Sequence, residues 1–64
     1  MKDKDYFQIR NCVYPEEKRI RLNMKKYDVY MLMGSHWEYK DAFNTYPEAV
    51  EYINKRISEF PKKN

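Results

Sequence analysis

Asn44-Thr45-Tyr46-Pro47-Glu48 is the stretch that decides the fold, because it marks the start of a helix directly after a series of strand-like segments. Thr45 and Glu48 have the spacing of a capping box, in which two side chains satisfy free backbone N–H groups at a helix start. Apolar residues then recur at helical spacing until Pro61 ends the segment. These residues are Tyr46, Val50, Ile53, Ile57 and Phe60. The sequence therefore predicts an amphipathic helix over residues 46–60 that covers one face of a sheet.

Two strand-like segments lie in the first part of the chain. Residues 6–14 alternate apolar and polar side chains with the period of two that is typical of a strand, and Pro15 ends the segment. Pro15 and the two glutamates after it would also suit the first turn of a helix. Residues 18–24 nevertheless show a period of two, which favours a second strand. Its apolar side would consist of Ile20, Leu22 and Met24.

Two more strand-like segments precede the helix. Lys25-Lys26 suits a short turn, and residues 27–33 are then apolar on both faces, as in a strand that is covered on both sides. A single long bent strand over residues 18–33 is the alternative. Gly34-Ser35 is a signal for a two-residue hairpin, and residues 36–43 alternate again. The predicted order is therefore four strands followed by one helix.

The alternation assigns each side chain to one of two sheet faces. The expected core beneath the helix consists of Phe7, Ile9, Ile20, Leu22, Val29, Met31, Trp37 and Tyr39. The opposite face is expected to hold Arg10, Arg19, Arg21, Tyr30, Leu32, His36 and Lys40. The fold class is thus α+β, with a four-stranded antiparallel sheet and one C-terminal helix. We expect a single domain over residues 1–64, with an ordered core over 6–60 and short loose ends.

Length and composition limit how such a domain is stabilised. A chain this short buries only roughly 60% of its unfolded surface, so we expect association with another chain, such as a homodimer. The single cysteine, Cys12, excludes an internal disulfide, and Cys12 with the single His36 falls short of the four ligands of a structural zinc site. No apolar run approaches the roughly 18 residues of a membrane span. We expect a cytoplasmic protein without metal, cofactor or membrane.

The charge and the aromatic residues favour an anionic partner. The formal charge is +3, from 13 basic and 10 acidic residues. A ring such as that of Tyr30 can stack on an unpaired base while arginines neutralise phosphates. We therefore expect a module that binds single-stranded DNA or RNA. Its predicted contacts are Arg10, Arg19, Arg21, Lys25, Lys26, Tyr30 and Lys40. The alternative is a solvated strand face whose arginines serve solubility and edge protection.

A second functional class is compatible with the same residues. Tyr30 and Leu32 on a face without a covering helix would also suit a protein interface. The chain would then be a small interaction protein, for example a phage or mobile-element product that modulates or inhibits a host protein. We do not expect an enzyme, because four strands and one helix offer little concavity for a positioned, water-excluded pair of catalytic groups.

The predicted order of elements resembles a known family. Lys26-Tyr27-Asp28-Val29-Tyr30 on the third expected strand, with a Thr-capped C-terminal helix, is similar to the PC4-like family of small single-stranded-DNA-binding coactivators. The resemblance covers most of residues 6–60. It implies homodimerisation through the helices and binding of unpaired DNA across the basic strands. The chain departs from the family at Glu38-Tyr39-Lys40-Asp41, where the family has a segment that contains glycine.

Overall fold

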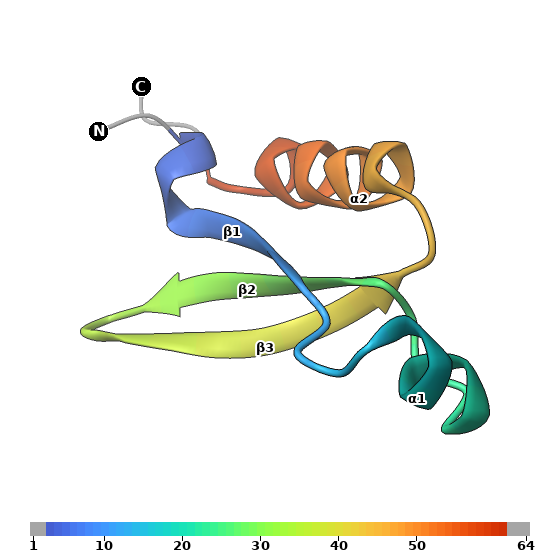
Figure 1. Ribbon diagram of the computed structural model, residues 1–64. Coiled ribbons are helices and arrows are strands. Elements are labelled where there is room, and N and C mark those ends of the chain that lie inside the picture. Colours follow the sequence, from blue (N-terminus) through green and yellow to red (C-terminus); the bar gives the residue numbers. More distant parts are fainter. Residues whose placement is uncertain (1–2, 62–64) are drawn as a thin grey trace.

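The computed structural model describes residues 3–61, and therefore only part of the ends that we expected to be loose. Its elements, in chain order, are a 3₁₀ turn η1 (Asp3–Tyr6), strand β1 (Phe7–Asn11), helix α1 (Glu16–Arg21), strands β2 (Tyr27–Met33) and β3 (His36–Phe43), and helix α2 (Tyr46–Ser58). The strands form one antiparallel sheet in the order β1-β2-β3, and α2 covers one face of it (Figure 1). The α+β class is confirmed, with three strands instead of the four predicted.

The fourth strand is missing because a short helix, α1, occupies most of residues 18–24. Pro15 precedes α1, and two glutamates lie in its first turn, where negative charge complements the helix dipole. Basic residues fill its last turn. The helix signal in the sequence was therefore the correct one, and both the second strand and the single long strand over residues 18–33 were wrong.

The end of α1 is fixed by a residue in the left-handed region. Asn23 has φ +57°, a conformation that asparagine tolerates better than most residues. The N–H of Asn23 donates to the carbonyl of Ile20 at 3.0 Å, and the N–H of Met24 donates to the carbonyl of Arg19 at 2.9 Å. This pair of bonds is a Schellman motif, which satisfies carbonyls at the helix end and turns the chain toward β2.

The predicted hairpin between β2 and β3 is confirmed. Gly34-Ser35 forms the turn, and Met33 and His36 are paired on either side of it. Gly34 has φ +66°, where a side chain would cause strain. The turn therefore sets which residues of the two strands lie opposite each other.

A β-bulge at Lys40 shifts which side chains of β3 lie on each face of the sheet. Val29 is paired with Asp41 but Tyr30 with Tyr39, so Lys40 is an extra residue without an opposite partner. Residues directly opposite in an antiparallel pair share a face. Tyr39 therefore lies on the side of Tyr30, away from α2. Trp37 is paired with Leu32, so the same rule places Trp37 on that side. The prediction that Trp37 and Tyr39 belong to the core beneath the helix was wrong.

Helix α2 agrees with the sequence prediction, apart from its last residues. The hydroxyl of Thr45 accepts a hydrogen bond from the N–H of Glu48 at 3.4 Å and donates one to its carboxylate at 2.8 Å. Pro47 occupies the first turn, where its missing N–H costs nothing. The start of the helix is thus encoded in the stretch Thr45–Glu48.

The core between α2 and the sheet is small. Within residues 3–61 its buried members are Phe7, Val29 and Ala49. Partly buried residues pack around them, namely Tyr6, Ile9, Met31, Phe43, Tyr52, Ile53, Ile57 and Phe60. Tyr46 and Val50, which we expected in the helix stripe, remain 49% and 38% exposed. Ile20 and Leu22 are exposed on or beside α1 and take no part in this core, contrary to prediction.

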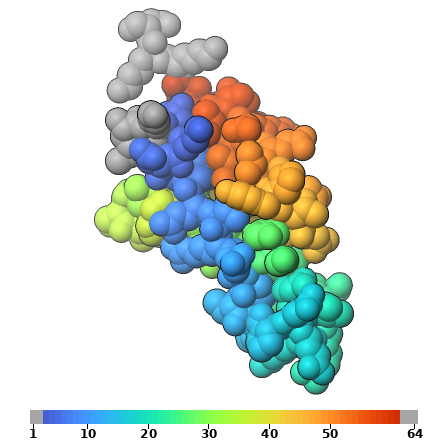
Figure 2. Space-filling view, turned by 45° about the horizontal axis from the view of Figure 1, so that its top comes forward, coloured from blue at the N-terminus to red at the C-terminus, as the bar shows by residue number. Residues whose placement is uncertain are grey.

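The connection between β1 and β2 projects from the rest of the molecule. We call residues 12–26, which include α1, the basic arm. Figure 2 shows this segment as a lobe at one end of the molecule, away from α2. No residue of α1 is buried, and Val13 and Ile20 are 89% and 64% exposed. The basic arm is therefore held at its two ends by the sheet and contributes little to the core.

Candidate nucleic-acid interface

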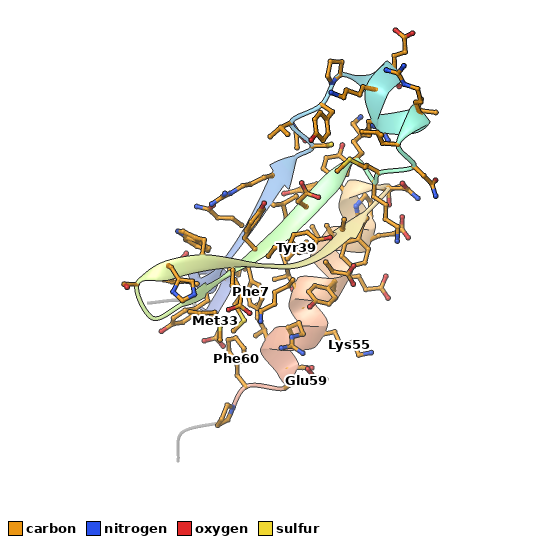
Figure 3. All side chains as sticks on the ribbon, turned by 90° about the horizontal axis from the view of Figure 1, so that it is seen from below. Phe7, Met33, Tyr39, Lys55, Glu59 and Phe60 are labelled. Atoms are coloured by element: carbon orange, nitrogen blue, oxygen red, sulfur yellow. The ribbon has the colours of Figure 1, made fainter. Side chains whose placement is uncertain are left out.

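The sheet face opposite α2, which we call the open face, is covered by no other element of the described chain. Its side chains come from alternate residues of β1 and β2 and from residues on both sides of the bulge in β3. They are Gln8 and Arg10 of β1, Asp28, Tyr30 and Leu32 of β2, and Trp37, Tyr39 and Ala42 of β3. Figure 3 looks onto this face, with Tyr39 over the sheet and α2 behind it.

Aromatic and guanidinium groups are packed together on the open face. The rings of Tyr30 and Tyr39 meet edge to face, with centroids 5.8 Å apart and an interplanar angle of 72°. The guanidinium carbon of Arg10 lies 4.1 Å from the centroid of Tyr30, and its Nε donates a hydrogen bond to Gln8 at 3.0 Å. Tyr39 is 54% exposed. The face therefore presents an exposed ring beside a positioned planar cation.

Acidic groups limit the positive charge of the open face. Asp28 lies opposite Arg10 in the strand register, and partial burial raises the pKa of its carboxyl. Partial burial also raises the pKa of Tyr39, with a further contribution from the negative charges of Asp28 and Asp41. Tyr39 therefore stays neutral at physiological pH, and the open face carries little net charge of its own.

The positive charge of the chain is concentrated on the basic arm. Residues 12–26 contain five of the 13 basic residues and two of the ten acidic ones. Their excess of three positive charges equals that of the whole chain, since the other residues carry eight charges of each sign. The aromatic surface and the positive charge thus lie on adjoining parts of the molecule, because the basic arm connects two strands of the sheet.

The structure separates the predicted contacts on the basic arm into two kinds. The side chain of Arg19 is only 15% exposed, lies 3.8 Å from Glu16, and donates to the carbonyl of Met24 at 3.4 Å. Arg19 therefore helps to hold α1. Arg21 and Lys25 are exposed to solvent. Neither arginine lies on the sheet, where the prediction placed both.

Lys26 and Lys40 also differ from the expected arrangement. The ammonium of Lys26 lies 5.4 Å from the ring centroid of Tyr27, at the start of β2. Lys40 donates to Glu38 at 2.9 Å, which lowers the pKa of that carboxyl, and His36 lies 3.7 Å from Glu38. Glu38 and His36 have the register of the helix side of β3. The structure thus groups Lys40 and His36 with Glu38 and not with Arg10.

Of the sequence-predicted site residues, Arg10, Tyr30 and Leu32 are brought together on the open face. Trp37 and Tyr39 were missed as members of this surface. The sequence did contain a signal for the position of Trp37. A two-residue turn at Gly34-Ser35 fixes the register of its flanking strands and places Trp37 opposite Leu32. That register assigns Trp37 to the open face without any three-dimensional information.

The described residues offer neither a metal site nor a membrane span. In residues 3–61 no three side chains of the His, Cys, Asp and Glu types are grouped so as to hold a metal ion. No helix in that range has the length and apolar character needed to cross a bilayer. In comparisons with known proteins, no family, no curated protein and no solved structure matches this chain. The PC4-like resemblance therefore stays a prediction.

Proposed function

We propose that this protein binds single-stranded nucleic acid, with unpaired bases stacked on the open face and phosphates held by the basic arm. The observation that carries the proposal is the exposed ring of Tyr39, which lies against Tyr30 while Arg10 covers the Tyr30 ring. Such a group of aromatic and guanidinium planes on an uncovered sheet is the type of surface on which bases stack.

The energetics favour binding with little sequence preference. Stacking of a base on an aromatic side chain contributes about 1–3 kcal/mol and tolerates every base, since each has a π-face. Hydrogen-bonding groups that could distinguish base edges are few on this face, where Gln8 is already bonded to Arg10. We therefore expect affinity to depend on length and accessibility of the strand more than on its sequence.

The geometry favours an unpaired strand over a duplex. Trp37 and Tyr39 are two residues apart on β3, which corresponds to about 7 Å along a strand. This spacing is roughly twice the 3.4 Å rise between stacked bases. An extended single strand can place successive bases at such a spacing, whereas the bases of a duplex are already stacked on one another. A duplex would be left with phosphate contacts to the basic arm alone.

A titration of a labelled single-stranded oligonucleotide, followed by fluorescence anisotropy, tests this function. Tyr39→Ala should weaken binding by about 1–3 kcal/mol, while Tyr39→Phe, which keeps the ring, should bind like the parent. Tyr46→Ala is the matched control, because Tyr46 is nearly as exposed, at 49%, but belongs to α2. Equal losses in Tyr39→Ala and Tyr46→Ala would contradict the proposal.

A second candidate, a protein-interaction module, is favoured by the exposed apolar residues of the basic arm. Val13, Ile20 and Leu22 are all at least half exposed. All three belong to one projecting segment, the basic arm (Figure 2), which could offer them together to a partner. In this case the double change Ile20→Ser with Leu22→Ser should abolish capture of the partner, and should leave oligonucleotide binding close to that of the parent.

A further inference from the structure

Strand β1 forms an edge of the sheet with a defined set of outward hydrogen-bonding groups. The N–H of Cys12 donates to the carbonyl of Lys26 at 2.8 Å, so this pair is directly bonded. Bonded and non-bonded pairs alternate along antiparallel strands. Gln8 and Arg10 therefore bond to β2, whereas the N–H and C=O groups of Phe7, Ile9 and Asn11 point away from it. These three residues form the outer edge of the described sheet.

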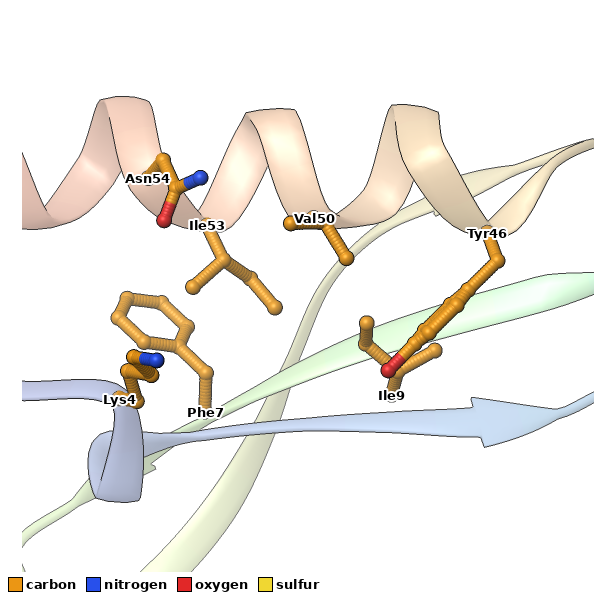
Figure 4. A pocket seen from close by; sticks show the side chains of 7 residues that line it. All are labelled: Lys4, Phe7, Ile9, Tyr46, Val50, Ile53 and Asn54. Atoms are coloured by element: carbon orange, nitrogen blue, oxygen red, sulfur yellow. The ribbon is translucent and has the colours of Figure 1, made fainter.

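A groove of mixed polar and apolar lining accompanies this edge on the side of α2. It has a volume of about 450 Å³ and lies between β1 and α2, as Figure 4 shows. The groove is lined by Phe7, Ile9, Tyr46, Val50 and Ile53 together with the polar residues Lys4 and Asn54. The groove exists because α2 packs against β2 and β3 and leaves β1 partly uncovered. An added strand beside β1 would direct every second side chain toward this groove.

We propose that the strand added at this edge is β1 of a second copy, paired antiparallel about a two-fold axis at Ile9. The outward groups of Phe7, Ile9 and Asn11 are symmetric about Ile9. Ile9 thus pairs with Ile9 of the second copy, and Phe7 pairs with Asn11 of the second copy. Every outward N–H and C=O of the edge gains a partner in this register.

Charge and packing favour a second copy as the occupant. The register places Arg10 opposite the neutral Gln8 of the second copy, so two arginines do not face each other directly. It also brings Ile9 of the second copy beside the groove of the first, next to the apolar side chains of Ile9 and Val50. A chain with only three buried residues in its described part gains apolar contact area where its own core is weakest.

The pairing would produce a continuous six-stranded sheet with both α2 helices on one face and both open faces on the other. This inference does not rest on nucleic-acid binding, since the edge of β1 and the open face are different surfaces. It also differs from dimerisation through the helices, which the PC4-like resemblance implies, because the contact here is made by β1.

Disulfide cross-linking tests the register directly. In the background Cys12→Ser, the change Ile9→Cys should give a covalent dimer on mild oxidation, because opposite bonded residues have Cα atoms about 5.5 Å apart. Gln8→Cys is the control, since the same register separates its two copies by more than the roughly 7 Å that a disulfide can span. Equal cross-linking of the two variants would overturn the proposal.

Sedimentation velocity over a range of protein concentrations tests the dimer without a covalent bond. The parent should dimerise, and Asn11→Pro should raise the dissociation constant by about tenfold or more, because symmetry removes an outward N–H at both ends of the contact. Asn11→Ala keeps that N–H and should dimerise like the parent. Circular dichroism shows whether Asn11→Pro is folded, and if it is not, the cross-linking pair decides. A monomeric parent would overturn the proposal, even if it bound an extended peptide at β1.

Discussion

Asp28 places a carboxylate on the open face, where we propose that nucleic acid, which is itself negatively charged, binds. It lies opposite Arg10 on the open face, and partial burial raises the pKa of its carboxyl. Between its ordinary pKa and the raised one, the folded protein holds a proton that the unfolded chain has lost. The free energy of unfolding therefore falls as the pH rises through this window, and it stays lower above it.

Asp28→Asn should accordingly stabilise the protein at neutral pH. We expect a higher thermal midpoint than that of the parent at about pH 7, and no difference at about pH 3, where the carboxyl is protonated in both states. Thermal unfolding followed by circular dichroism at both values measures the effect. A midpoint that is unchanged at neutral pH would show that burial of Asp28 carries no cost. The same variant should bind oligonucleotide more tightly, since a negative charge leaves the open face.

Among the elements, α1 has the least support from packing, so its ends determine whether it forms. It has six residues and none is buried. An isolated helix of this length is unstable in water. The Schellman motif at Asn23 and the contacts of Arg19 with Glu16 and Met24 therefore hold the basic arm in shape.

Substitutions of Asn23 test the role of this helix end. Asn23→Gly should preserve α1, because glycine adopts positive φ at no steric cost. Asn23→Val should destabilise the left-handed conformation by about 1–2 kcal/mol. Hydrogen exchange of the Met24 amide measures the difference, since that N–H donates to Arg19 within the motif. Equal protection in the two variants would contradict this account.

The elements also differ in how far the sequence predicted them. Helix α2 combines a cap at Thr45, Pro47 in its first turn and several helical periods, so its signals agree with one another. Helix α1 is shorter than two turns. The alternation of Ile20, Leu22 and Met24 favoured a strand in the prediction, although the Pro-Glu-Glu sequence before them is a signal for a helix start. A period of two arises by chance in so short a segment.

The faces of β3 could be predicted only in part. The turn at Gly34 fixes the register up to Tyr39, and so it assigns Trp37 and Tyr39 to the open face. The bulge at Lys40 is marked by no comparable turn signal in the sequence. It allows Phe43 to reach the core on one side of the sheet while Tyr39 remains on the other.

At the scale of the whole molecule, charge and aromatic surface occupy different regions. The basic arm carries an excess of positive charge equal to that of the chain, and the open face holds the rings. Phosphate contacts release counterions, so the affinity for nucleic acid should fall steeply with salt. The slope of the logarithm of the binding constant against the logarithm of the salt concentration is proportional to the number of phosphate contacts, which we assign to the basic arm.

Arg21→Ala should reduce that slope by about 0.7, the contribution of one contact to a single strand. Lys55→Ala is the matched control, because Lys55 is exposed on α2 (Figure 3). Anisotropy titrations of an oligonucleotide at several salt concentrations measure both slopes. If the slope of the salt dependence falls equally in the two variants, the positive charge acts from the whole surface and not from the basic arm.

The fluorescence of Trp37 tests the central claim most directly. Trp37 is the single tryptophan of the chain and lies on the open face, opposite Leu32. Titration with an unlabelled single-stranded oligonucleotide at low salt should quench this emission to saturation, as a base stacks on the face. Added salt should restore the emission, and a duplex should quench it far less. An emission that stays constant while the oligonucleotide binds, or the absence of binding at low salt, would contradict the assignment of the open face to unpaired bases.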